Sequence, residues 1–300
     1  MKRFLEMSRA PFFVAIIVPA LFANALAWRD TSSVDWPSFA LIMISLVAAH
    51  ADANLLNDYF DWRLGADRIN ANRNPLSGGS PHIAEGRAEP SLFLWSGVVS
   101  FAAAAAAGVA LLLTCGRPLL PLLLMGLAGL AAGVLYTAPP FKLAYRGLGE
   151  ACIFAAFGIL PVAGVYYVQA GGIRAPVIAA SLPLAFLITD VILVNEFPDC
   201  ESDRRAGKRQ LVVRLGTRRA RFLYLALALG AFAMVAWLAT ASGYGGWTAL
   251  AFLALPFSLA AAAILFRRHR EPRALLPAQG LTIAAHALAG LLLTAGLLLK

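Results

Sequence analysis

Long apolar runs separated by shorter polar connections dominate this chain of 300 residues. A run of about 20 apolar residues is long enough to cross a bilayer as a helix. The runs are rich in leucine, alanine and glycine, and they lack the alternating pattern of a membrane β-barrel. The pattern therefore predicts an all-α, polytopic membrane protein. Uncharged stretches cover residues 10–28, 91–116, 151–173, 222–266 and 274–299.

The polar connections divide the runs into nine predicted spans, which we assign to a single bundle and a single domain over residues 1–300. The stretch 222–266 is too long for one span, and we divide it at the glycine-rich segment 242–247. Residues 63–90 are predicted to form a long loop with one short helix, which either covers an active site or serves as a flexible tether. The predicted helices cover residues 10–28, 36–62, 91–114, 119–136, 151–169, 176–197, 222–241, 247–266 and 274–299.

The basic residues predict an orientation in the membrane. Of the 25 Lys and Arg residues, 21 precede the first helix or lie in the connections from even-numbered to odd-numbered helices. Connections rich in Lys and Arg face the cytoplasm. We therefore interpret the net charge of +9 as topology in a cell (inner) membrane, not as a sign of nucleic-acid binding. The N-terminus and the active-site loops are predicted to be cytoplasmic.

Two acidic clusters end apolar runs on this predicted cytoplasmic side. The first covers residues 57–67 (NDYFDWRLGAD), and the second covers residues 195–203 (NEFPDCESD). In each cluster an Asn stands four residues before an Asp, so the two side chains lie one above the other on a helix. Neighbouring carboxylates repel unless a cation joins them, and Mg²⁺ is commonly held by one or two carboxylates together with phosphate oxygens. The clusters predict a pair of magnesium–diphosphate shelves facing one cavity.

Basic residues beside these clusters are candidates for binding phosphate oxygens: Arg73, Lys142, Arg204 and Lys208. Lipid headgroups are the alternative partners for such residues, and for Arg73, Lys142 and Lys208 both interpretations stay open. Tyr136 is a candidate substrate contact or a member of an interfacial aromatic belt. The other candidate substrate contacts are Asn54, Asp58, Arg146 and Asn195.

Three segments carry a resemblance to a known family: NDYFD…GAD, YTAPPFKLAYRGLGE and NEFPDCESDRRAGKRQLVVRLG. Together they resemble the UbiA-type intramembrane prenyltransferase superfamily, over nearly the whole chain. Within it, YRGLGE, PVAGVYYVQAG and DRRAGKRQL are most similar to the 1,4-dihydroxy-2-naphthoate polyprenyltransferases of menaquinone synthesis.

This resemblance implies a Mg²⁺-dependent enzyme that transfers a polyprenyl group from polyprenyl diphosphate to an aromatic acceptor, here dihydroxynaphthoate, giving demethylmenaquinone. Many relatives carry a third acid of the first motif where this chain has Gly65, and Asp67 is predicted to replace it. The implied catalytic residues are Asn57, Asp61 and Asp199, and the implied metal ligands are Asn57, Asp61, Asp67, Asp199 and Asp203.

Three alternatives were weighed against this interpretation. Another acceptor, such as 4-hydroxybenzoate, is compatible with the same acidic motifs. An ion-coupled transporter would use acids inside the membrane, but only Asp190 lies deep in a span. A CDP-alcohol phosphotransferase requires Gly after the second Asp, where this chain has Trp62. The sequence leaves the prenyl chain length and the oligomeric state open.

Overall fold

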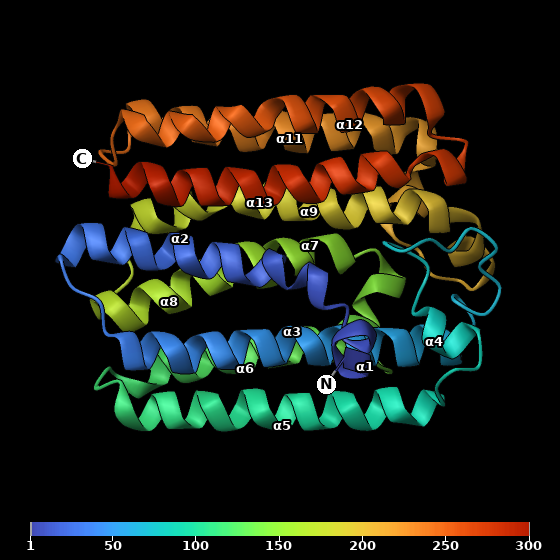
Figure 1. The fold of residues 1–300 in the computed structure, drawn as a ribbon, viewed down its shortest axis with the longest axis horizontal. Helices are drawn as coiled ribbons and strands as arrows, with labels where there is room; N and C mark the ends of the chain where they lie inside the picture. Colours follow the sequence, from blue (N-terminus) through green and yellow to red (C-terminus); the bar gives the residue numbers. More distant parts are fainter. Residues whose placement is uncertain (1, 300) are drawn as a thin grey trace.

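The computed structural model describes residues 2–299. In this part of the chain, nine long apolar helices lie side by side in one bundle, as the sequence predicts (Figure 1). The spans are Ala10–Thr31, Trp36–Leu64, Pro90–Thr114, Leu119–Thr137, Gly149–Ala170, Ala175–Arg205, Thr217–Thr240, Gly246–Arg268 and Leu276–Leu298.

Six of the nine spans are uninterrupted α-helices: α3 (Trp36–Leu64), α5 (Pro90–Thr114), α6 (Leu119–Thr137), α9 (Ala175–Arg205), α11 (Thr217–Thr240) and α13 (Leu276–Leu298). The other three change helix type along their length: η1 (Ala10–Phe13) runs into α2 (Val14–Thr31), α7 (Gly149–Ile153) continues through a π-helical stretch (Phe154–Ile159) into α8 (Leu160–Ala170), and η4 (Gly246–Ala254) runs into α12 (Leu255–Arg268). Short elements lie outside the spans: α1 (Lys2–Met7), α4 (Pro81–Ala84), η2 (Leu143–Arg146), α10 (Leu211–Leu215) and η5 (Pro272–Ala274).

The two helices that carry the acidic clusters are longer than a bilayer requires. Helix α3 has 29 residues and α9 has 31, so at about 1.5 Å per residue each extends well beyond a hydrocarbon core of about 30 Å. Asp35 caps the start of α3 by accepting a hydrogen bond from the Ser38 amide, and Gly65 ends it with a φ of 97°. The extra turns carry the polar residues beyond the apolar part of each helix.

The second cluster differs from expectation in one respect. The sequence predicts that the sixth span ends near residue 197 and that the second cluster opens the following loop. That prediction is wrong: α9 continues through Pro198 to Arg205. Asp199 and Asp203 therefore stand on helix rather than loop, one turn apart.

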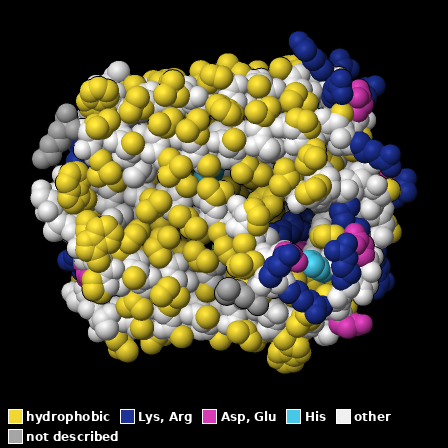
Figure 2. All heavy atoms as spheres, in the orientation of Figure 1, with side chains coloured by type: hydrophobic (Ala, Val, Ile, Leu, Met, Phe, Trp, Pro, Cys, Tyr) yellow, Lys and Arg dark blue, Asp and Glu magenta, His cyan; other side chains and the backbone are white. Residues whose placement is uncertain are grey.

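The face of the bundle that Figure 2 shows is largely apolar. Large side chains on α5 and α6 point outward, with Val99 66%, Leu113 79% and Leu120 64% exposed. Such exposure is expected where lipid is the solvent. Inside, α2, α9 and α13 pack around fully buried side chains that include Phe22 and Leu184.

Polar chemistry gathers at one end of the bundle. Many Lys and Arg side chains lie at the end that holds α4 and the connection after α3 (Figures 1 and 2). That connection, predicted as a loop with one short helix, contains α4 as its helix. Both acidic clusters lie at this same end.

Candidate active site

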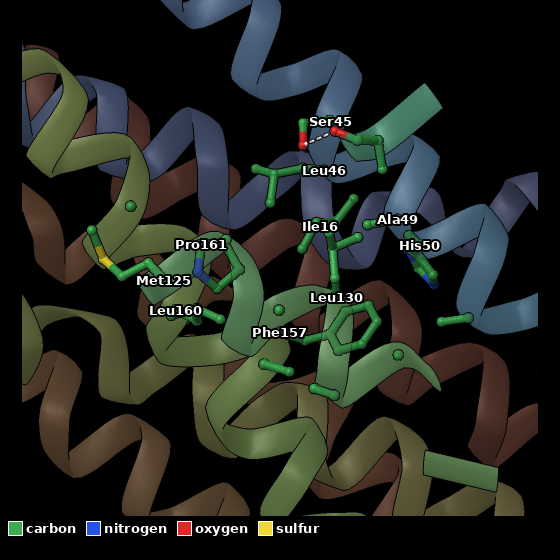
Figure 3. Close-up of a pocket in the computed structure, with 18 of the residues that line it drawn as sticks. Ile16, Ser45, Leu46, Ala49, His50, Met125, Leu130, Phe157, Leu160 and Pro161 are labelled. Atoms are coloured by element: carbon green, nitrogen blue, oxygen red, sulfur yellow. Dashed lines mark hydrogen bonds between the residues drawn. The ribbon is translucent and has the colours of Figure 1, made fainter. Parts of the chain in front are cut away.

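An apolar cavity of about 360 Å³ runs between the helices of the first half of the bundle, with α9 closing one side (Figure 3). Along α3 its lining extends from Ile42 to Asn57, which is about 22 Å at 1.5 Å per residue. The walls are mostly leucine, alanine and glycine. Its polar lining residues are concentrated toward the end with the acidic clusters: Arg9, Asn54, Asn57, Tyr136 and Asn195. The shape suits a long apolar chain that carries a polar head.

Asp61 lies at the centre of the polar end. Its carboxylate accepts hydrogen bonds from Tyr145 Oη at 2.8 Å, Lys208 Nζ at 2.8 Å and Asn57 Nδ2 at 3.1 Å. The Asn57–Asp61 contact is the interaction that their spacing of four residues predicts. Asp61 is buried, and these three donors satisfy its carboxylate oxygens.

Lys208 links the two acidic clusters. Its side chain pairs with Asp61 on α3, and its amide donates to the Asp203 carbonyl on α9 at 2.8 Å. Burial alone would lower the pKa of the Lys208 ammonium, but the carboxylates of Asp203 and Asp61 outweigh burial and raise that pKa. A charged ammonium therefore stands between the clusters.

Asp199 also faces the first half of the chain. It accepts a hydrogen bond from Asn70 Nδ2 at 2.7 Å, so the loop after α3 reaches across to α9. Asp203, one turn further along α9, is buried. The predicted convergence of the two clusters is therefore present in the structure.

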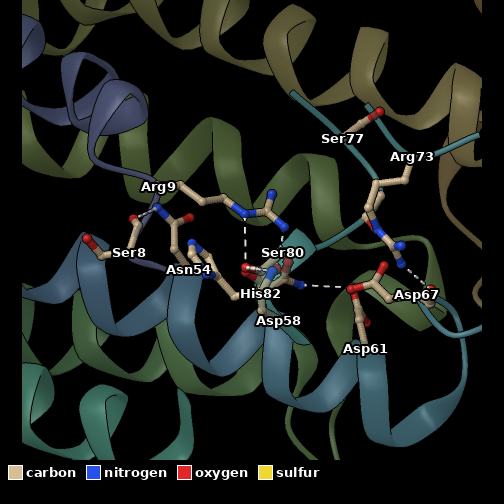
Figure 4. A network of polar contacts seen from close by, with 12 residues as sticks. Ser8, Arg9, Asn54, Asp58, Asp61, Asp67, Arg73, Ser77, Ser80 and His82 are labelled. Atoms are coloured by element: carbon tan, nitrogen blue, oxygen red, sulfur yellow. Dashed lines mark hydrogen bonds and ion pairs between the residues drawn. The ribbon is translucent and has the colours of Figure 1, made fainter. Parts of the chain in front are cut away.

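Asp67 is held in place by the backbone of its own loop (Figure 4). Its amide donates to the Asp61 carbonyl at 3.3 Å, and Arg73 donates to the Asp67 carbonyl at 2.5 Å and the Gly78 carbonyl at 2.7 Å. Gly79 has a φ of 81°, and a Cβ there would lie 2.1 Å from Asp67 Oδ2. Arg73, a predicted diphosphate ligand, thus orders the loop that presents Asp67.

Arg9 is a site residue that sequence reasoning missed. It lines the cavity and forms an ion pair with Asp58, one turn before Asp61 on the same side of α3 (Figure 4). Burial alone would lower the pKa of the Arg9 guanidinium, but the carboxylates of Asp58 and Asp67 raise it. Burial raises the pKa of Asp67, and Asp61 and Asp58 raise it further. The only sequence signal for Arg9 was its position as a lone Arg just before the first apolar run.

Three predicted site residues are brought to the cavity beside these groups. Asn54 donates to the Ser8 carbonyl at 2.9 Å, and Asn195 accepts from Gln279 Nε2 at 2.9 Å. Tyr136 lines the cavity, and its buried hydroxyl has no hydrogen-bond partner within the described residues. Tyr136 is therefore the side chain best placed to meet a polar group of a ligand.

Other predicted cations lie away from the cavity lining. Arg146 is exposed and donates to the Pro140 carbonyl at 2.9 Å. Arg204 is exposed and pairs with Glu201 at 3.4 Å. Lys142 lies 5.4 Å from the centre of the Tyr145 ring, at the edge of the site. Their assigned roles stay predictions.

The donor set fits a divalent cation that shares its ligands with a diphosphate. Across residues 2–299, no three Asp, Glu, His or Cys side chains form a ready-made metal cluster. Within the described part of the chain, the carboxylates of Asp67 and Asp203 accept no hydrogen bond, so their oxygens can serve as ligands. Hard oxygen donors of this kind, completed by water and phosphate, suit Mg²⁺.

Comparison with known proteins agrees with this geometry. The model of the UbiA prenyltransferase family matches residues 16–286. The chain is 27% identical to the 1,4-dihydroxy-2-naphthoate octaprenyltransferase of Bacillus subtilis (strain 168), over 98% of this chain and 92% of that protein. It is 30% identical to the enzyme of the same name from Escherichia coli (strain K12), over 96% of this chain and 91% of that protein.

A solved structure confirms the fold. A UbiA homolog from Archaeoglobus fulgidus, bound to DMAPP and Mg²⁺, matches with a TM-score of 0.64 at 16% identity, covering 99% of each chain. The predicted family resemblance and the helical membrane fold are both confirmed.

Proposed function

This chain belongs to the UbiA prenyltransferase family, and within it we propose a Mg²⁺-dependent transfer of a polyprenyl group to 1,4-dihydroxy-2-naphthoate. The protein is a multi-pass membrane prenyltransferase that acts on aromatic acceptors. The observation that carries the proposal is a convergence of charged residues at the polar end of a long apolar cavity. Lys208 and Arg9 meet four aspartates there: Asp61, Asp67, Asp199 and Asp203.

The prenyl donor fits this site in one orientation. Its isoprenoid tail occupies the apolar cavity between α3, α5, α6 and α8, where it meets few polar atoms. Its diphosphate then lies among the carboxylates and two cations, the buried Lys208 and the partly buried Arg9. Mg²⁺, held by Asn57 and the four aspartates, would neutralise the charge that develops on the leaving diphosphate.

The chain's own residues provide the rest of the leaving-group site. Lys208 and Arg9 stabilise negative charge as the bond between the allylic carbon and the diphosphate oxygen breaks, and the diphosphate leaves with the electron pair. Tyr145 and Asn57 keep Asp61 oriented through their hydrogen bonds. The residues of this site are already held in place by hydrogen bonds to one another, so little reorganisation is needed when the bond breaks.

The acceptor is placed beside the allylic carbon, within reach of Tyr136 and Asn195. An electron-rich ring carbon forms a bond to the allylic cation, and in dihydroxynaphthoate the carboxylate on that carbon leaves as carbon dioxide. The support for this acceptor is the similarity to two naphthoate enzymes along almost the full chain. We also propose that the site faces the cytoplasm of a cell membrane, because 21 of 25 basic residues precede or connect helices at that end.

The test is an acceptor competition with purified protein in lipid nanodiscs. A labelled polyprenyl diphosphate is supplied with dihydroxynaphthoate, 4-hydroxybenzoate or both, with and without Mg²⁺. We expect a decarboxylated prenyl-naphthoquinol that forms only when Mg²⁺ is present. A product from hydroxybenzoate alone would overturn the acceptor assignment, and full turnover after removal of all divalent ions would overturn the metal assignment.

A further inference from the structure

Two buried glutamates lie behind the active site and have no part in the proposed reaction. Glu150 on α7 is 3% exposed, and Glu196 on α9 is 2% exposed. Glu150 Oε1 accepts the amide hydrogen of Leu211, and Glu196 Oε2 accepts that of Val212 at 3.2 Å. Two glutamates from separate spans thus hold consecutive amides at the start of α10.

The second oxygen of each carboxyl is left in an unusual position. Glu150 Oε2 and Glu196 Oε1 are buried and accept no hydrogen bond within the described residues. The two carboxyl groups are nevertheless neighbours, because they accept hydrogen bonds from the consecutive amides of Leu211 and Val212. Two carboxylates cannot hydrogen-bond to one another, and two buried like charges repel strongly. A single proton between the pair removes both conflicts.

The segment that this pair anchors is the one that carries Lys208. The chain leaves α9, turns at Gly207 and enters α10 at Leu211, only three residues beyond Lys208. On the opposite side, Arg209 donates its amide to the Tyr145 carbonyl at 3.2 Å, and Lys208 donates its amide to the Asp203 carbonyl at 2.8 Å. Movement of the α10 start would therefore move the Lys208 ammonium relative to Asp61.

We propose that Glu150 and Glu196 share one proton and act as a positioning pair, which fixes the start of α10 and thereby keeps Lys208 on Asp61. The pair does not line the substrate cavity, so its effect passes through Lys208. The titratable groups around it are Tyr136 from α6, Asp203 from α9 and Lys208 itself. The catalytic consequence rests on the proposed function, whereas the shared proton does not.

The shared proton has a direct spectroscopic test that needs no activity. The other five glutamates are exposed to solvent: Glu6, Glu85, Glu89, Glu201 and Glu271. In protein grown with isotope-labelled glutamate, the infrared spectrum should contain one carboxylic-acid carbonyl band that shifts with the label. The band should vanish in Glu196→Gln. Absence of the band from the wild-type protein at neutral pH would overturn the shared proton.

The positioning role is tested by a double-mutant cycle in the prenyl-transfer assay. Glu196→Gln should retain near-normal kcat, because its amide can donate to Glu150 and accept from Val212. Glu196→Ala should lower kcat at least tenfold, and adding Lys208→Met should cause little further loss beyond that of Lys208→Met alone. Glu271→Ala, an exposed control, should be unchanged. Losses that multiply in the double variant would contradict action through Lys208.

Discussion

Replacing Asp61 with Ala should both abolish prenyl transfer and destabilise the protein, because Asp61 is the acceptor for a buried cation. Its carboxylate accepts hydrogen bonds from Lys208, Tyr145 and Asn57, and the side chains of Asp61 and Lys208 are only 3% and 9% exposed. Removing one partner of a buried ion pair costs about 3–5 kcal/mol, since the other charge is left unpaired. The Tyr145 hydroxyl also loses its acceptor, which costs about 1–3 kcal/mol, and the two losses overlap.

The double variant Asp61→Ala/Lys208→Met distinguishes the loss of the buried ion pair from a general loss of packing. Methionine keeps much of the lysine volume and carries no charge, so the double variant should recover most of the thermal stability lost in Asp61→Ala. The double variant should remain inactive, because it lacks both Asp61, the proposed metal ligand, and Lys208, the proposed phosphate-binding cation. Thermal unfolding of the detergent-solubilised variants measures the first quantity, and turnover of labelled donor measures the second. A double variant as unstable as the sum of the two single variants would refute a paired, buried Lys208.

Other perturbations probe the remaining parts of the site. Asp199→Ala should abolish turnover but lower the unfolding midpoint only slightly, because among the described residues the Asp199 carboxylate accepts a hydrogen bond from Asn70 alone; thermal unfolding and product assay together check this. Arg9→Gln should raise the KM for the donor at least tenfold by removing a cation that lines the cavity, as steady-state kinetics would reveal; an unchanged KM would remove Arg9 from the diphosphate site. Gly79→Ala should lower kcat, because its Cβ would displace Asp67, whereas Gly86→Ala, which has the same sign of φ but no neighbour within 4 Å, is the matched control. Chelation of divalent ions should stop turnover, and added Mg²⁺ should restore it; activity that persists in the chelator would contradict a metal-bound donor.

The polar spacing in the sequence was sufficient to predict much of the site. Asn57 and Asp61 were expected to meet because they stand four residues apart on a helix, and the structure contains that hydrogen bond. The polar face of α3 likewise directs Asn54 and Asp58 toward the interior of the bundle. Helical periodicity determines such contacts locally, so no knowledge of the tertiary fold was needed.

Contacts between distant segments could not be obtained in this way. Arg9 meets Asp58 across 49 residues, and Tyr145 meets Asp61 across 84. Contacts across such long separations leave no periodic pattern in the sequence, because they depend on how the spans pack. Composition also cannot tell which of several cations faces inward: Lys208 lies at the centre of the site, whereas Arg204, four residues earlier, faces outward and pairs with Glu201.

The balance of charge at the polar end explains why these groups are together at all. Five aspartates gather around two cations, the buried Lys208 and the partly buried Arg9: Asp58, Asp61, Asp67, Asp199 and Asp203. Arg9 is committed to Asp58 and Lys208 to Asp61, which leaves three carboxylates without a cation of their own. A diphosphate without a metal ion would add negative charge to these three carboxylates. A divalent cation alone would not account for the apolar cavity. A metal–diphosphate head with an isoprenoid tail satisfies both the excess carboxylates and the cavity, so the charge balance and the cavity support the same substrate class by separate physical arguments.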